Sequence, residues 1–366
     1  MKTYIYILCI LFFCRTAAAD IVLSTSIHHT YGLVHKEAQT IPMLGGKDIL
    51  ESTSDMSALR IPHVREWVYR YMTRHRGAVD SASKNARYYR AFVQDVFAAY
   101  PDFPEILTDL PILESSYNPK AVSHAGAVGL WQFMPETARG LDMQIGRWSD
   151  ERRNLIVSTR SAIIHLSYLK KRHGSWELAL AAYNCGSGRV DKAVNSSPGF
   201  SYWDLVSSGR LPYETSFYVQ KFSALSIINR NRSLFGFHES EYDSYRMRFI
   251  TLKYPVSIRD LAVCSEVPES VIYFFNPQLT RQSTPLIVKN YSILIPAENA
   301  DILRQNEEKL YKLRFNCIKT HTVRKGEYLG KIARQYNVPM KYIIAINTLR
   351  KPYTLYPGST LYIPIL

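Results

Sequence analysis

Apolar side chains recur at intervals of three and four residues through residues 58–236, which is the spacing of one face of an α-helix. The first such face is formed by Val64, Trp67, Val68, Tyr71 and Met72. Similar faces follow within residues 88–97 and 155–169, and Gly174 stands where a helix commonly ends. The pattern predicts a helical domain over 58–236. Residues 20–57 lack such periodicity and are predicted to be a loose leader.

A weak internal repeat of about forty-five residues fills most of the remaining chain. Its second copy, residues 321–364, has the pattern of a strand, two short helices and a closing strand, with a turn at Pro357-Gly358. The first copy, residues 249–296, follows the same order less clearly. Residues 297–318 are charged and predict a helical spacer. We therefore expect a mainly α protein, with one helical domain followed by two small βααβ modules.

The N-terminus has the parts of a secretory signal peptide. Lys2 precedes an apolar run of eleven residues, and small residues follow up to Ala19, after which we expect cleavage. The run is shorter than the ~20 residues of a transmembrane helix. Residues 1–19 are thus interpreted as a signal peptide. A lipid anchor on Cys14 is the alternative, although the bulky Phe13 directly before it argues against one.

Charge narrows the range of partners. The 366 residues carry 45 Lys+Arg against 31 Asp+Glu, a formal net charge of +14. A basic surface favours an anionic partner. Export argues against nucleic acid, and an acidic membrane face and an acidic polymer both stay open as partners.

Three cysteines remain after the signal peptide: Cys185, Cys264 and Cys317. An odd number allows at most one disulfide within the chain. Cys264–Cys317 is the favoured pair, and three free thiols are the alternative. No metal site is expected, because the ten histidines never form an HxxxH pair.

Candidate chemistry lies in the helical region. Glu114 closes the apolar run 110–113, and burial against apolar groups raises the pKa of a carboxyl, which suits a general acid. Nine residues later, the segment from Ser123 to Gln132 contains two glycines three positions apart. These glycines allow a tight loop that presents the polar side chains at both of its ends. Taken singly, each feature is more common as ordinary capping or turn chemistry.

Four motifs in a fixed order change that interpretation. They are Glu-Ser-x-Tyr-Asn-Pro from Glu114, Ser-x-x-Gly-Ala-x-Gly-Leu-x-Gln-Phe-x-Pro from Ser123, Ala-Tyr-Asn-x-Gly around Tyr183, and Glu-Thr-x-x-Tyr-Val from Glu214. Together they resemble the lytic murein transglycosylases, which are exported bacterial enzymes with a goose-lysozyme-like helical fold. The resemblance covers about residues 60–236.

The resemblance implies a role for each matching residue. Glu114 matches the catalytic acid/base of the family. Substrate-binding and supporting positions are matched by Ser123, Gln132, Tyr183, Asn184 and Glu214. The implied reaction breaks the bond between N-acetylmuramic acid and N-acetylglucosamine of peptidoglycan, and the C6 hydroxyl then closes a 1,6-anhydro ring. It is a lyase reaction that uses no metal or cofactor.

The second copy of the repeat resembles the LysM module, which binds glycans that contain N-acetylglucosamine. The match rests on His321-Thr322-Val323, Gly326, Leu329, Ile332-Ala333, Asn347 and Pro357-Gly358. The first copy is a degenerate match, and its glycan binding stays open. With the Arg-Glu-Trp-Val segment at residues 65–68, this tail resembles the membrane-bound D type of the family, which allows an association with the outer membrane. The resemblance implies a protein of the periplasm or cell envelope of a Gram-negative-type bacterium, either free or anchored to a membrane, and we expect a monomer.

Two other functions remain open. The first is a lysozyme-type hydrolase on the same fold, which needs a second carboxylate near Glu114. Glu214 is the candidate for that carboxylate, and the nearer acids in the sequence fall outside the motifs. The second is a wall-binding protein without catalysis. The polar set around Glu114 argues against it, since a scaffold has no packing need for those residues. The sequence leaves endo- or exo-acting cleavage and the biological role of the reaction open.

Overall fold

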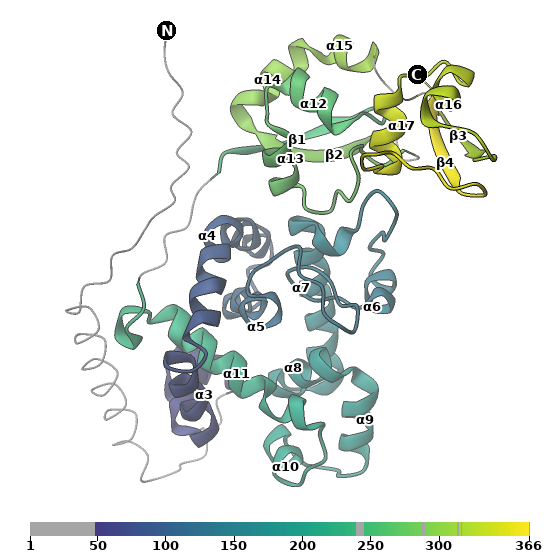
Figure 1. Ribbon diagram of the computed structural model, residues 1–366. Coiled ribbons are helices and arrows are strands. Elements are labelled where there is room, and N and C mark those ends of the chain that lie inside the picture. The colour runs from purple at the N-terminus through teal and green to yellow at the C-terminus, as the bar shows by residue number, and fades with distance from the viewer. Residues whose placement is uncertain (1–47, 239–244, 287–289, 313–314, 316, 366) are drawn as a thin grey trace.

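The computed structural model describes residues 48–238, 245–286, 290–312, 315 and 317–365 (Figure 1). The predicted signal peptide and the leader up to residue 47 lie outside the described residues. In the part of the chain that is described, no helix is both long and apolar enough to cross a lipid bilayer.

A bundle of helices forms the larger body of the protein. Its α-helices are α2 (Ile49–Ser54), α3 (Pro62–Met72), α4 (Arg76–Ala98), α5 (Leu110–Ser115), α6 (Pro135–Gly140), α7 (Leu155–His173), α8 (Trp176–Cys185), α9 (Ser187–Asn195), α10 (Tyr202–Ser207) and α11 (Tyr213–Arg230). Short 3₁₀ turns are η2 (Ser57–Arg60), η3 (Glu105–Asp109), η4 (Glu151–Arg153) and η5 (Ser233–Phe235). The prediction of a mainly helical protein is confirmed.

Local sequence sets the ends of these helices. The Asn154 side chain accepts hydrogen bonds from two backbone N–H groups in the first turn of α7, which satisfies donors that no helical carbonyl reaches. Gly174 ends the same helix with φ of 84°, a left-handed conformation that glycine adopts without strain. Ser175 then caps α8. The helix end predicted at Gly174 is therefore observed.

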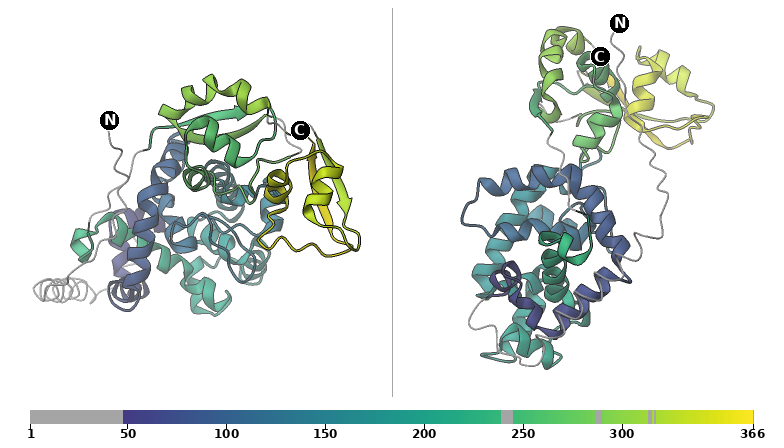
Figure 2. Two further views of the ribbon diagram at one scale, coloured as in Figure 1. Left: turned by 45° about the horizontal axis from the view of Figure 1, so that its top comes forward. Right: turned by 90° about the vertical axis from the view of Figure 1, so that its left-hand side faces the viewer.

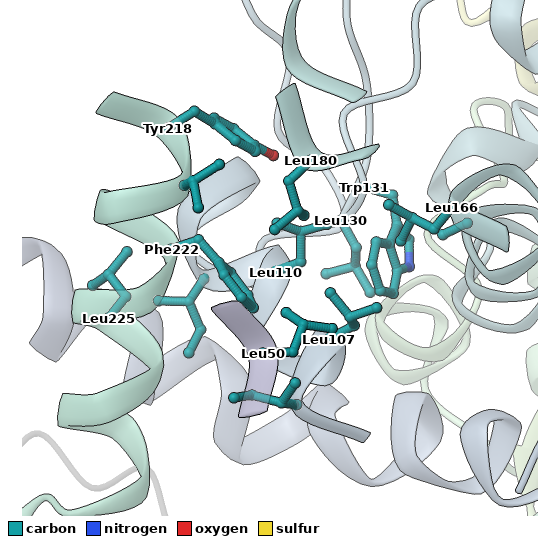
Figure 3. Packing of buried hydrophobic residues seen from close by; sticks show 14 of the residues in the cluster. Leu50, Leu107, Leu110, Leu130, Trp131, Leu166, Leu180, Tyr218, Phe222 and Leu225 are labelled. Atoms are coloured by element: carbon teal, nitrogen blue, oxygen red, sulfur yellow. The ribbon is translucent and has the colours of Figure 1, made fainter. Parts of the chain in front are cut away.

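One apolar core fills the space between α4, α5, α7, α8 and α11. Figure 3 shows part of it, with Leu107, Leu110, Leu130, Trp131 and Phe222 in close packing and Tyr218 at the edge. The indole N–H of Trp131 donates to the Thr159 hydroxyl at 3.0 Å, so this large side chain is buried with its polar atom satisfied. The core packs behind α5 and fixes the position of that short helix.

The start of the helical body differs from the sequence prediction, which placed a loose leader over residues 20–57. Helix α2 begins at Ile49, whose side chain is fully buried in the main core. The backbone N–H of Ile49 donates to the Glu177 carboxylate at 3.2 Å, and Thr53 donates to Ser223 at 3.0 Å. A helix of six residues is too short for apolar periodicity to identify it in the sequence.

The two C-terminal modules share one architecture. In the first, β1 (Met247–Leu252) pairs antiparallel with β2 (Tyr291–Pro296), and α12 (Ile258–Ser265) and α13 (Glu269–Phe275) lie between them in sequence. In the second, β3 (Cys317–Thr322) pairs antiparallel with β4 (Thr360–Ile365), with α16 (Leu329–Gln335) and α17 (Met340–Asn347) between. Both therefore have the expected βααβ order.

A shared hydrogen-bond scheme supports the internal repeat. The Asn276 amide donates to Leu294 O at 2.7 Å, and its Oδ1 accepts from Leu294 N at 2.8 Å. Asn347 makes the same pair of bonds with Tyr362, at 2.7 and 2.9 Å. In each module one asparagine thus ties the end of the second helix to the closing strand.

The segment predicted as a spacer, residues 297–318, is helical but does more than connect the modules. Helices α14 (Ala297–Gln305) and α15 (Glu307–Lys312) place Ala300, Leu303 and Leu310 in the apolar core of the first module. Strand β3 also begins inside this segment. The charged residues that suggested a spacer alternate with apolar ones that face the module.

The first module packs directly on the helical body (Figure 2). The ring of Phe274 stacks on Tyr89 with centroids 5.2 Å apart, and Phe275 contacts Phe92 at 6.0 Å. Phe275 and Leu294 belong to the main core of the helical body. The two parts are therefore joined by shared apolar packing as well as by the chain.

The described cysteines carry free thiols at Cys185 and Cys264. The side chain of Cys317 lies outside the described part of the chain, so the expected pair with Cys264 has no structural counterpart here.

Candidate active site

Glu114 is the penultimate residue of α5. Ser116 and Tyr117 after it have φ of 51° and 58°, so the chain turns sharply away and leaves the carboxyl at the end of the helix. The phenol of Tyr218, which projects from α11, donates a hydrogen bond to Glu114 Oε1. Burial raises the pKa of Glu114 to about 7, the Tyr218 hydrogen bond lowers it, and the charge of Glu214 raises it.

Tyr183 of α8 lies beside the same carboxyl. Its pKa is raised above the usual value, first by burial and then by the charge of Glu114. Its hydroxyl donates to Trp131 O at 2.6 Å, and its ring lies 5.7 Å from the ring of His165 and 6.2 Å from that of Phe133. Tyr183 is therefore a fixed, uncharged wall of the site.

The segment between Ala121 and Phe133 forms a tight loop, called here the catalytic loop. Val128 pairs with both Val122 and Phe133, which folds the segment back on itself twice. Gly129 has φ of 91°, and a Cβ atom there would lie 1.8 Å from the backbone oxygen of Arg152. Only glycine fits at this position.

Two predicted residues lie in this loop. Ser123 Oγ accepts a hydrogen bond from Ala127 N at 3.0 Å. Gln132 has φ of 48°, and its Nε2 donates to Gly129 O at 2.9 Å. The loop is joined to α5 because Ser115 Oγ donates to Leu130 O at 2.9 Å. The residue next to Glu114 thus holds the loop that carries Ser123 and Gln132.

A buried ion pair supports the loop from behind. Arg152 bonds Asp150 through two nitrogens, Nε to Oδ1 at 3.0 Å and Nη2 to Oδ2 at 2.8 Å. Its remaining Nη1 donates to Gly126 O at 3.0 Å and to Phe133 O at 3.2 Å. One guanidinium therefore connects the middle of the loop to its C-terminal end.

Asn184 and Glu214 complete the predicted set. The Thr215 hydroxyl donates to Asn184 Oδ1 at 2.7 Å, which joins the end of α8 to the start of α11. Glu214 lies in the first turn of α11, exposed to solvent, and its charge raises the pKa of Glu114. Glu214 and Tyr218 are four residues apart on one helix, so they lie on the same face.

The other acids near Glu114 in the sequence have different surroundings. Asp109 is buried and forms ion pairs with Arg90 at 2.7 Å and with Arg230 at 3.2 Å. Asp102, Glu105 and Glu136 are exposed to solvent, and the acid whose charge raises the Glu114 pKa is Glu214. Across the described ranges, no group of three His, Cys, Asp or Glu side chains could hold a metal ion.

The predicted residues thus lie on three helices, α5, α8 and α11, and on one loop. Sequence reasoning gave no role to Tyr218, Asp150 or Arg152. Tyr218 stood in the Glu-Thr-x-x-Tyr-Val motif, and its spacing from Glu214 was the signal for a shared helix face. Asp150 holds the Arg152 side chain, and Arg152 bonds backbone carbonyl groups of the loop. Because every residue has a carbonyl group, no sequence motif indicates these contacts.

Family comparisons agree with this arrangement. Residues 96–206 match the transglycosylase SLT domain, residues 246–312 the LysM-like domain of lytic transglycosylase MltD, and residues 321–364 the LysM domain. The chain therefore carries an SLT domain followed by two LysM-type domains, as the motifs predicted. The SLT match includes Glu114, Ser123, Gln132, Tyr183 and Asn184.

Among individual proteins, the chain is 32% identical to membrane-bound lytic murein transglycosylase D of Escherichia coli (strain K12) over 276 residues, which is 71% of this chain and 60% of the relative. It is also 43% identical to a putative tributyltin chloride resistance protein of Alteromonas sp. (strain M-1) over 96 residues, or 26% of this chain and 46% of the relative. The chain thus spans about 60% of the length of the first relative. The 70 kDa soluble lytic transglycosylase SLT70 of Escherichia coli matches 62% of this chain and 47% of its own at 17% identity, with a TM-score of 0.31, a likeness too low to support an inference.

Proposed function

We propose that this protein is a peptidoglycan lytic transglycosylase, which cleaves the β-1,4 bond from N-acetylmuramic acid to N-acetylglucosamine and leaves 1,6-anhydro ends. The observation that supports this most is the state of Glu114. Burial raises its pKa to about 7, so a large share of the carboxyl keeps its proton near neutral pH. Tyr218 meanwhile supplies a donor for the anion that forms when the proton leaves.

The first half of the reaction uses Glu114 as an acid. Its proton passes to the glycosidic oxygen, the bond from that oxygen to C1 of N-acetylmuramic acid breaks, and N-acetylglucosamine leaves as an alcohol. Positive charge develops at C1, where the N-acetyl oxygen of the same sugar stabilises it. The carboxylate left at Glu114 is stabilised by the Tyr218 phenol.

The second half uses Glu114 as a base. The carboxylate takes the proton of the C6 hydroxyl, and O6 bonds to C1, which closes the anhydro ring and restores the acid. Because the nucleophile belongs to the same sugar, its effective concentration is high and water competes poorly. No second carboxylate and no cofactor is needed.

Three polar side chains have hydrogen-bonding groups left for substrate. Ser123 Oγ accepts from Ala127 N, so its own proton is available for the N-acetyl oxygen. Gln132 uses Nε2 on Gly129 O and keeps its carbonyl oxygen for a sugar N–H or O–H. Asn184 uses Oδ1 on Thr215 and keeps its two N–H donors. Each residue is oriented by the protein before substrate binds.

Hydrolysis on the same site is the second candidate, and Glu214 is the observation that favours it. Its charge acts on Glu114, so a water molecule between the two carboxyls could be activated as in inverting glycosidases. Its exposure at the start of α11 weighs against that role, because an exposed side chain has little fixed orientation toward a substrate or a water molecule.

The LysM-type modules are proposed to bind the glycan strands of the same polymer. The net charge of +14 suits a wall polymer that carries carboxylates. Location in the periplasm or at the outer membrane, and a monomeric state, belong to this proposal and rest on the signal-peptide pattern.

Digestion of purified peptidoglycan, followed by mass analysis of the soluble fragments, tests the proposal. Fragments with 1,6-anhydro ends support the transglycosylase. Fragments with reducing ends, heavier by one water molecule, replace it with the hydrolase. Binding to the wall without any released fragment would leave only the third function, a wall-binding protein.

A further inference from the structure

The segment from Arg147 to Asp150 lies between the helical body and the first module. Asp150 N donates to Gln278 O at 2.9 Å, and Thr280 N donates to Trp148 O at 3.1 Å, which pairs the segment with the turn after α13. The Thr280 hydroxyl donates to Arg147 O at 2.7 Å. These bonds join residues that are about 130 positions apart in the chain.

Two more contacts extend this junction. Ser149 Oγ and Tyr291 Oη form a hydrogen bond of 3.1 Å, so the segment also reaches strand β2. The ring of Trp148 lies 5.5 Å from the ring of Tyr362 on strand β4, in the second module. Arg147 lies over the same Tyr362 ring at 4.4 Å. Both modules therefore meet on these four residues.

The inner end of the segment reaches the catalytic loop. Asp150 holds Arg152 by two charged hydrogen bonds, and both side chains are buried. Arg152 in turn bonds the carbonyls of Gly126 and Phe133. Arg152 thus links Asp150, which contacts the first module, to the loop that carries Gln132.

We infer that residues 147–152, called here the junction segment, form a positioning device through which the two C-terminal modules hold the catalytic loop in its working shape. This inference rests on the proposed function and assigns the first module a task besides glycan binding. Asp150 and Arg152 are positioning residues, since neither touches Glu114.

The geometry explains why outside support is needed. Gln132 in this loop has φ of 48°, a left-handed conformation that costs backbone free energy for a residue with a side chain and persists only when neighbours fix it. Arg152 fixes two of the loop's carbonyls, and its backbone oxygen closes on Gly129. The Arg152 guanidinium can bond both carbonyls only while Asp150 holds the guanidinium plane in a fixed orientation. Asp150 is itself fixed by the hydrogen bond from its backbone N–H to Gln278 O.

Part of the surface of the first module is occupied by its contact with α4 and with the junction segment. Its helix α13 contributes Phe274 and Phe275 to the aromatic residues of α4, and the turn at Gln278–Thr280 pairs with the junction segment. Phe275 and Gln278 are buried and Phe274 and Thr280 are half-buried, so this surface is occupied by the contact with the helical body. The first copy of the repeat matches the LysM pattern only in degenerate form, which agrees with a module whose residues are used to contact the helical body.

Kinetics on a soluble, uncrosslinked glycan fragment test the inference with the full-length chain. Thr280→Val and Tyr291→Phe together remove two side-chain bonds to the junction segment and leave the residues of the site unchanged. We expect kcat to fall about 3- to 10-fold, because small displacements of positioned groups cost large factors in rate. KM should stay within about twofold, and the midpoint of the pH–rate profile should not move, because Glu114, Tyr218 and Glu214 keep their contacts.

A double-mutant cycle distinguishes an effect that passes from the modules through Arg152 to the catalytic loop from a general loss of protein stability. Arg152→Lys keeps the charge and loses the fork, so it should lower kcat about tenfold by itself. Combined with Thr280→Val and Tyr291→Phe, it should cost little more, because both changes interrupt the same connection. Arg172→Lys is the matched control, since Arg172 forms an exposed pair with Asp191 at 2.7 Å and should keep full activity.

The outcomes distinguish this inference from the proposed function. If the unaltered protein releases no anhydro fragments, the proposed function itself is wrong. If it does so and the docking variants keep kcat within about 1.5-fold, or if the losses in the cycle multiply as independent effects, the positioning role is wrong. Should Arg152→Lys fail to fold, the docking variants alone decide between these results.

Discussion

Tyr218 of α11 donates a hydrogen bond to Glu114 of α5, across 104 positions of sequence. The bond opposes the effect of burial on the same carboxyl: burial favours the acid, and the phenol favours the anion. A group that must first give a proton and then take one back needs both forms to be accessible. A pKa of about 7 satisfies that need near neutral pH.

Glu114→Gln should abolish the release of fragments while wall binding is retained. Glutamine has nearly the same shape but carries no transferable proton, so the loss should reach about 10³-fold or more. Fragment release and sedimentation with insoluble peptidoglycan measure the two properties on one sample. Substantial residual cleavage by this variant would remove Glu114 from its assigned role.

Tyr218→Phe should move the alkaline limb of the pH–rate profile upward. In the intact protein, rate falls as pH rises through about 7, because Glu114 loses the proton that it must donate. The Tyr218 bond lowers the Glu114 pKa, so its removal raises that pKa further and keeps the acid protonated to higher pH. The maximum rate should fall about tenfold, since the anion loses its donor.

Glu214→Gln provides a control of opposite sign. The charge of Glu214 raises the Glu114 pKa, so the neutral variant should shift the same limb to lower pH. Shifts of both variants in one direction would contradict this account of the site. If Glu214→Gln instead abolishes all cleavage without moving the limb, the hydrolase becomes the better interpretation.

Gly129→Ala and Gly126→Ala should differ sharply, although both residues have φ near 90°. At Gly126 nothing lies within 4 Å of an added Cβ, so the cost is backbone strain of about 1–2 kcal/mol. At Gly129 the added atom would lie 1.8 Å from the Arg152 oxygen, and the loop must move. Thermal unfolding and kcat of the two variants check this: Gly129→Ala should lose more of both, and equal losses would contradict the close approach.

Asp109→Ala should destabilise the protein by about 3–5 kcal/mol, because it leaves the buried Arg90 guanidinium without its carboxylate partner. Asp191→Ala is the control, since its pair with Arg172 is exposed and worth less than about 1 kcal/mol. Urea denaturation measures both. A loss at Asp109 as small as that at Asp191 would show that Arg90 finds other partners.

Deletion of residues 321–366 should weaken binding to insoluble peptidoglycan more than it slows cleavage of soluble fragments. The helical body and the first module keep their own apolar cores, while Leu286, Phe315 and Trp148 lose the contacts that they make with the core of the second module. A several-fold loss of kcat is expected from the lost Tyr362 contact with Trp148. Equal wall binding with and without the module would exclude it as the glycan-binding part.

The structural features that the sequence patterns predicted are those that depend on residues close to one another in the chain. Helical periodicity and the end of α7 at Gly174 follow from short segments, and both are observed. Glu114 after its apolar run is half-buried, and its pKa is raised as expected. The βααβ order of the modules is confirmed for the same reason.

Features formed by residues far apart in the chain could not be predicted in this way. Helix α2 is identified only by the core into which Ile49 packs. The partners of Arg152 are backbone carbonyls, which carry no sequence signature. The link between Tyr218 and Glu114 depends on how α11 crosses α5, so the motif indicated the residue and only the fold gives its role.

The packing of Phe275 and Leu294 into the main core has a practical consequence for how the chain can be divided. A fragment cut at the start of the sequence repeat would leave Tyr88, Tyr89 and Phe92 of α4 facing water, an aromatic area prone to self-association. The smallest fragment that keeps this surface closed runs from α2 to the end of α15. A chain that is cut before β1 should therefore be hard to keep in solution, and the same chain carried through Lys312 should not.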